Sequence, residues 1–293
     1  MMIRTTLGNL KRMASVRFAL LHRSLRSSEA SIIILCAPLG MIVGVVVFIL
    51  RETIYALHEF FFGYGPHGYL SEQTSIEPWR LVAVPVSVGL AFGLLAFWVR
   101  RTRSAEITDP VEANALFGGR MGKLDSFRLT LATMISNAAG GSLGMEAGYT
   151  QSGAAIFATV AQYFRLRRDE ARIYVTAGTA AAIAAAFNAP LAGAFYGFEL
   201  VLGSYSPRAL APVAVAALAG ALTIQMLGTD APLFAVSEEF KITPLLYLLF
   251  AFVGVAAAGF SILTMRSVTW AEQALRRFPI WIRPAIGGAA LSL

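Results

Sequence analysis

The sequence predicts an all-α integral membrane protein, folded as a bundle of broken helices. Only 14% of its 293 residues are charged, whereas a soluble domain carries about 25%. Its mean hydropathy is +0.65. Four stretches contain no charged residue and are close to the roughly 20 residues that a membrane span needs: residues 31–50, 81–99, 209–229 and 242–265. These apolar stretches are too long and continuous to be strands.

The distribution of basic residues predicts which loops are cytoplasmic. Lys and Arg concentrate on the cytoplasmic side of membrane proteins. They gather in residues 1–30, 100–128, 165–172 and 266–283, whereas residues 51–80 carry four Glu against two Arg. We therefore expect a multi-pass protein of the bacterial inner membrane, with residues 1–30 as a cytoplasmic N-terminal segment. The first apolar stretch follows about thirty polar residues and has no cleavage site after it, so it is not a removable signal.

The apolar stretches and the basic loops together predict the helices before residue 100 and after residue 208, which are taken here in chain order. The first helix crosses outward and continues to about residue 61, and a second returns over residues 81–99. Further along the chain, residues 209–229 cross outward and residues 242–265 return. We expect residues 266–283 to form a separate amphipathic segment along the interface, because Trp270 and Trp281 lie among basic residues. A last helix begins at about residue 286.

Residues 129–164 are predicted to enter the membrane and turn back. Both flanks are basic, and Glu146 is the one charge among these 36 residues. Glycines at 140, 141, 144 and 148 break the helix at the turning region. Irregular backbone at membrane depth persists only where protein buries it or a watery cavity adjoins it. A second break is predicted at Asn188-Ala189-Pro190, which separates helices over about 173–187 and 190–207.

The glycine-rich turn GGSLGMEAG (residues 140–148) is the candidate functional site. The first N–H groups of a helix have no partner within the helix, and the helix dipole makes that end positive. Such an end binds an anion weakly enough to release it again. Glu146 can occupy the anion's place and act as a gate; alternatively, it only caps the helix. Ser142 can donate to an anion or satisfy backbone groups of the turn.

Two segments resemble the CLC family of chloride channels and transporters. GGSLGMEAGYTQSGAAI (residues 140–156) resembles the family's G-x-S-x-G-R-E-G-P motif with its following Q-x-G-A. YVTAGTAAAIAAAFNAPLAGAFYGFE (residues 174–199) resembles the family's segment around F-N-A-P-L-A-G and F-x-x-E. Weaker similarity runs through residues 110–122 and 283–288.

The resemblance implies a glutamate-gated chloride pathway in each subunit of a homodimer. Glu146 matches the gating glutamate, and the backbone of Gly144, Met145 and Ala147 matches the anion-coordinating turn. The family folds as two inverted halves, and residues 31–293 resemble about one of them. We therefore expect a truncated CLC-like membrane domain whose anion site is half built. A non-conducting partner of a full-length relative is an alternative.

Three departures from the family pattern bear on function. Met145 replaces the motif's arginine. The position of the family's inner-site serine falls on Ile107, and the neighbouring Thr108 either supplies a hydroxyl or only caps a helix. Glu199 matches the first acid of the family's E-E pair, but the second, which relays protons in the family's antiporters, is Leu200. This favours passive or weakly proton-coupled transport; proton-coupled or fluoride-type antiport is the alternative. Glu199 either takes the place of the missing second acid or supports helix packing through hydrogen bonds.

Other functional classes find little support. The single cysteine and three scattered histidines match no metal-ligand spacing, and no motif for a cofactor is present. No aromatic–basic pattern indicates nucleic-acid binding. Glu146 and Glu199 lie at different depths, so they cannot act as a catalytic pair, and we expect no enzymatic activity. The expected partners are chloride or another small anion, the lipid bilayer and a second copy of the chain.

Overall fold

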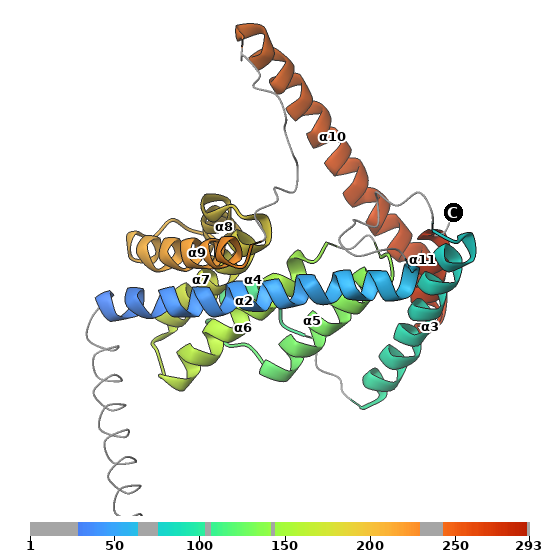
Figure 1. Cartoon of the computed structure of the whole chain (residues 1–293), viewed down its shortest axis with the longest axis horizontal. Helices are drawn as coiled ribbons and strands as arrows, with labels where there is room; N and C mark the ends of the chain where they lie inside the picture. Colours follow the sequence, from blue (N-terminus) through green and yellow to red (C-terminus); the bar gives the residue numbers. More distant parts are fainter. Residues whose placement is uncertain (1–28, 64–75, 103–106, 142–143, 229–242, 292–293) are drawn as a thin grey trace, which may run out of the picture. The chain divides into compact units, whose positions relative to one another are not determined.

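The computed structural model describes residues 29–63, 76–102, 107–141, 144–228 and 243–291, and these residues form helices and no strand (Figure 1). They divide into two compact units. The first unit contains most of α2 (Glu29–Phe62), followed by the chain from Glu106 to Ala138 and from Ser142 to Pro232. The second contains Phe60–Ala105 and Leu233–Leu293, together with Ala139–Gly141. Each unit is described separately below.

The first unit is built around a buried helix, α7. Its other elements are α4 (Pro110–Ala115), α5 (Lys123–Ala138), α6 (Glu146–Tyr163), α8 (Pro190–Tyr196), the π-helix η2 (Gly197–Leu202) and α9 (Pro207–Met226). Helix α7 (Arg168–Phe187) packs against both α6 and α9. Residues 174–185 of α7 are all buried, and most of them are Ala, Gly or Thr. Small side chains let neighbouring helices approach closely, so this composition explains the central place of α7.

Glycines allow helices to make close contacts in this unit. At the crossing of α6 and α7, a Cβ atom on Gly153 would overlap the carbonyl oxygen of Gly178, and a Cβ on Gly178 would overlap that of Gly153. Where α2 crosses α9, a Cβ on Gly40 would lie 3.1 Å from the Cα of Ala216. The backbones therefore touch directly, and each contact requires the absence of a side chain.

We expect Gly178→Ala to destabilise the protein by about 1–3 kcal/mol, the usual cost of overpacking a well-packed core. The added methyl group would overlap the Gly153 carbonyl and lie 2.8 Å from Cδ2 of Phe157. Thermal unfolding in detergent measures the loss. Gly259→Ala is the matched control, because a Cβ there meets nothing within 4 Å. Equal melting temperatures for the two variants would contradict the close packing of α6 on α7.

The described residues of the second unit form the end of α2 and the helices α3 (Pro78–Thr102), α10 (Pro244–Leu275) and α11 (Arg283–Leu291). Helices α3 and α11 pack against each other. A Cβ on Gly288 would overlap the Pro85 carbonyl, so this contact also depends on a glycine. Helix α10 exposes nearly all of its apolar side chains within the unit. An apolar, exposed helix of this length suits lipid or another protein surface inside a membrane.

The four predicted apolar helices are confirmed. Four of the described helices are long and apolar enough to cross a membrane: Ile32–Phe62, Pro78–Trp98, Pro207–Met226 and Leu246–Leu275. The two predicted breaks are confirmed as well. Helix α5 ends at Ala138 and α6 begins at Glu146. Helix α7 ends at Phe187, Asn188 adopts a left-handed conformation with φ 50°, and Pro190 opens α8.

Two expectations about boundaries are wrong. Residues 266–275 are not a separate amphipathic segment, because α10 continues without interruption to Leu275. Between Gly259 and Pro279 the sequence has no glycine or proline to stop it. The helix after Pro190 ends at residue 202 rather than 207, since Gly203 takes a left-handed φ of 70° after the π-helix.

Candidate anion-binding site

The N-terminus of α6 has free backbone donors. Met145 is the N-cap residue, and its side chain makes no capping hydrogen bond. The first helical hydrogen bond runs from the Tyr149 N–H to the Met145 carbonyl, at 2.9 Å. The N–H groups of Glu146, Ala147 and Gly148 therefore have no acceptor among the described residues. The positive end of an 18-residue helix is left open for an anion or a carboxylate.

The Glu146 carboxylate lies back against the turn that precedes it. A Cβ atom on Gly144 would overlap Oε2 of Glu146 and lie 2.6 Å from its Cδ. The carboxylate thus occupies space that is available only because residue 144 is glycine. Glu146 is half-buried, so a proton or an anion in an adjoining aqueous space can reach it.

The other residues predicted for this turn contribute differently. Gly144 and Ala147 are exposed at the turn. The Met145 side chain is only 7% exposed and packs in the apolar core, so that residue offers its backbone alone. Ser142 lies outside the described residues. The structure brings Gly144, Met145, Glu146 and Ala147 together, while their roles in anion binding remain predictions.

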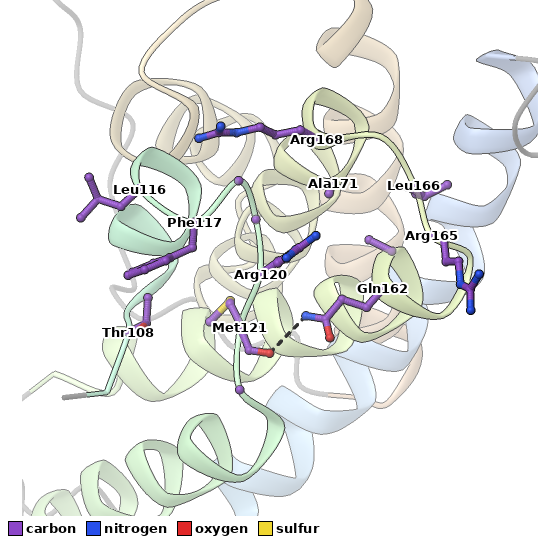
Figure 2. Close-up of a pocket in the computed structure, with 14 residues that line it drawn as sticks. Thr108, Leu116, Phe117, Arg120, Met121, Gln162, Arg165, Leu166, Arg168 and Ala171 are labelled. Carbon is purple, nitrogen blue, oxygen red and sulfur yellow. Dashed lines mark hydrogen bonds between the residues drawn. The ribbon is translucent and has the colours of Figure 1, made fainter. Parts of the chain in front are cut away.

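The start of α4 is already capped, in contrast to α6. Oδ1 of Asp109 accepts a 2.7 Å hydrogen bond from the Glu112 N–H, so an acidic side chain occupies this helix end. Thr108 precedes the cap and is half-exposed. Figure 2 places its side chain at the edge of a cavity in the same unit. Binding of an anion by the Thr108 hydroxyl remains a prediction. The sequence analysis did not predict the cap by Asp109.

A buried glutamine connects the starts of α4 and α6. Gln151 is 1% exposed, and its Nε2 donates to the Thr108 carbonyl at 3.1 Å and to Ser126 Oγ at 3.0 Å. Tyr196 lies within electrostatic range of both Glu146 and Asp109. Neither Gln151 nor Tyr196 is among the residues that the sequence predicts for the site. The candidate site thus includes residues of α6, the two residues before α4 and the end of α8.

We expect Gln151→Leu to destabilise the protein by about 1–3 kcal/mol, because the Thr108 carbonyl would lose its buried donor. The loss should appear as a lower melting temperature in detergent. Gln225→Leu is the control, since Gln225 also donates through its side chain, to Asn188 Oδ1 at 2.8 Å, but is exposed. A larger loss of melting temperature for Gln225→Leu than for Gln151→Leu would contradict the stabilising role of the buried Gln151 hydrogen bonds.

Arg51 places a positive charge near α6 that sequence reasoning also missed. It lies in α2, and its guanidinium is within electrostatic range of Tyr149. Its Nε is buried without a hydrogen-bond partner among the described residues. A cation within electrostatic range of Tyr149, in the first turn of α6, adds to the positive potential of that helix end.

Glu199 lies apart from this turn, in the π-helix η2. It is exposed, and Oε1 accepts a 2.6 Å hydrogen bond from the Tyr205 hydroxyl. This hydrogen bond raises the pKa of Tyr205, because the deprotonated phenol would lose it and face the carboxylate. Leu200, at the position of the family's second acid, is 52% exposed.

Solved structures with a similar fold include CLC proteins. A slow cyanobacterial Cl⁻/H⁺ antiporter matches with a TM-score of 0.69 and 18% identity, over 89% of this chain and 64% of its own. A CLC-type fluoride/proton antiporter matches with a TM-score of 0.60 and 24% identity, over 88% of this chain and 63% of its own. At these sequence identities, the structural similarity shows that the chain shares their fold.

Curated relatives include proteins described as voltage-gated ClC-type chloride channel ClcB. The Yersinia pestis protein is 28% identical over 248 residues, 83% of this chain. The Escherichia coli protein is 28% identical over 268 residues, 89% of this chain. The chain spans 60% and 63% of the lengths of these two relatives. The model of the voltage gated chloride channel family matches residues 88–293, which is more than half of the chain. The protein is therefore a multi-pass membrane protein that belongs to the voltage gated chloride channel (CLC) family.

Proposed function

We propose that the protein carries small anions, chloride first, across a bacterial inner membrane through a pathway gated by Glu146. One observation supports this most directly. Helix α6 begins with free N–H groups, and a carboxylate from its own first residue lies at the same turn. An anion and this carboxylate would compete for one positive helix end. Transport of an anion through a protein of this kind needs no enzymatic step.

The gate follows from the charges at this turn. While Glu146 is ionised, its carboxylate is stabilised by the α6 dipole and repels an arriving anion. Protonation neutralises the carboxylate, and a sufficiently high anion concentration displaces it. Because the helix end carries only a partial positive charge, the bound anion can also leave, which conduction requires. Gly144, Met145 and Ala147 would contribute backbone to the anion's surroundings.

Passive or weakly proton-coupled transport is the form we favour. Leu200 has no ionisable group to pass protons from the inside. Glu199 is held by Tyr205, which supports a structural role for that acid. Proton-coupled antiport is the second candidate, because both solved structures compared above are described as proton antiporters. The proposed working form is a homodimer in a lipid bilayer.

The test is anion efflux from liposomes that contain the purified chain, with chloride, fluoride and proton movement recorded together. Chloride efflux without stoichiometric proton movement supports the passive pathway. Chloride or fluoride efflux tied to proton uptake supports antiport instead. Protein that is inserted and folded but passes neither anion would reject independent transport by this chain, leaving the role of a non-conducting partner.

A further inference from the structure

A large cavity opens between the loops on one side of the first unit. It has a volume of about 1090 Å³, and its walls are the end of α4, the loop of residues 116–122, the end of α6 and the start of α7 (Figure 2). Sites for small organic ligands typically measure 300–1,000 Å³. The cavity is therefore far larger than a halide ion requires, and it can hold an organic anion.

Three arginines line the cavity, and Figure 2 shows Arg165 directed away from Arg120. Figure 2 shows Arg120 in the middle of the lining residues and Arg168 along their upper edge. Neither of these two guanidinium groups has an ion-pair or hydrogen-bond partner among the described residues. Three carboxylates of the same loops are already engaged: Asp109 caps α4, Asp125 lies 3.5 Å from Arg128, and Glu170 accepts the Arg167 N–H. Two uncompensated cations facing one cavity favour a multivalent anion.

Glycines in the loop leave room for the Arg168 side chain. Gly118 and Gly119 have φ values of 61° and 79°, a conformation that favours glycine. A Cβ on Gly118 would lie 2.8 Å from both Cγ and Nε of Arg168, so glycine leaves room for that side chain to cross the cavity. A Cβ on Gly119 would lie 2.7 Å from the Ala171 carbonyl oxygen, which fixes the loop against α7. The N–H groups of Arg120 and Met121 have no acceptor among the described residues.

We propose that this cavity binds a phosphate group, either of a soluble organic phosphate or of an anionic lipid headgroup. A guanidinium presents paired N–H donors that match phosphate oxygens, and two of them balance a dianion. The cavity lies among the basic segments that the positive-inside rule assigns to the cytoplasm, where both kinds of ligand occur. This inference does not depend on the proposed transport function.

The direct test measures binding of inorganic pyrophosphate to the full chain in detergent by calorimetry. The double substitution Arg120→Gln, Arg168→Gln should weaken binding at least about tenfold. The double substitution Arg266→Gln, Arg277→Gln is the matched control, because neither residue lines the cavity. It also removes two positive charges and should change the affinity less than about twofold. Pyrophosphate binding that is equal in the wild type and the Arg120→Gln, Arg168→Gln variant would overturn the proposal.

A second test uses the wild-type chain alone and also identifies the ligand source. Phenylglyoxal modifies accessible arginines, and mass spectrometry locates the modified residues. Pyrophosphate in detergent should protect Arg120 and Arg168 but not the exposed Arg277, which does not line the cavity, if the ligand is a soluble phosphate. Protection in phosphatidylglycerol nanodiscs but not in phosphatidylcholine nanodiscs indicates a lipid headgroup. If neither pyrophosphate nor phosphatidylglycerol protects Arg120 and Arg168, the site does not exist.

Discussion

Glu146→Gln should raise the initial rate of chloride efflux from liposomes about tenfold and remove its rise on acidification. The carboxylate lies at the free N-terminus of α6, where a negative charge is stabilised by roughly 0.3–2 kcal/mol. An anion must overcome this stabilisation to enter, and about 1.4 kcal/mol corresponds to tenfold. Glutamine keeps the shape of the side chain but loses the charge. Acidification has the same effect on the wild-type carboxylate, so the variant should no longer respond to it.

The control for this prediction is Glu59→Gln. Glu59 is exposed in the last turn of α2, so its substitution removes one negative charge without touching a helix N-terminus. Its efflux rate should equal that of the wild type. Chloride affinity, measured by calorimetry, gives an independent reading that should rise only in Glu146→Gln. A Glu146→Gln protein with wild-type chloride affinity and wild-type pH response would eliminate Glu146 as the gate.

Much of the fold could be predicted because membrane solvation limits the alternatives. A bilayer requires long apolar helices, so four uncharged stretches gave four helices that are long enough to span it. Asn188 and Pro190 predicted a break that the structure confirms. The end of α10 could not be predicted by hydropathy, because a helix continues past a change in polarity as long as nothing interrupts its hydrogen bonds.

The candidate site could be predicted only where its residues are neighbours in the sequence. The glycine-rich turn and Glu146 lie within nine residues, so the break and the charge were visible together. The bridge from Gln151 to Thr108 joins residues 43 positions apart, and one sequence gives no sign of that pairing. The Glu146 carboxylate lies in the space beside Gly144 because of its side-chain conformation, which one sequence does not give either.

This overlap predicts a second large effect: Gly144→Ala should raise the chloride affinity of the chain about threefold to tenfold. An alanine Cβ would occupy the position of Glu146 Oε2, so the carboxylate would have to leave the turn. It would then lose most of its interaction with the α6 N-terminus, which is worth roughly 0.3–2 kcal/mol, and compete less with the anion. Titration of chloride into purified protein by calorimetry measures the change.

The comparison with Glu146→Gln shows whether the alanine acts through the carboxylate. If it does, Gly144→Ala should add little to chloride affinity once residue 146 is glutamine, so the two substitutions should be strongly non-additive. Gly254→Ala is the control, because a Cβ there meets nothing within 4 Å and the affinity should not change. Additive effects in the double variant would mean that Gly144 influences anion binding through the backbone of the turn. In that case, the position of the Glu146 carboxylate at the helix end would not depend on the space that glycine leaves at residue 144.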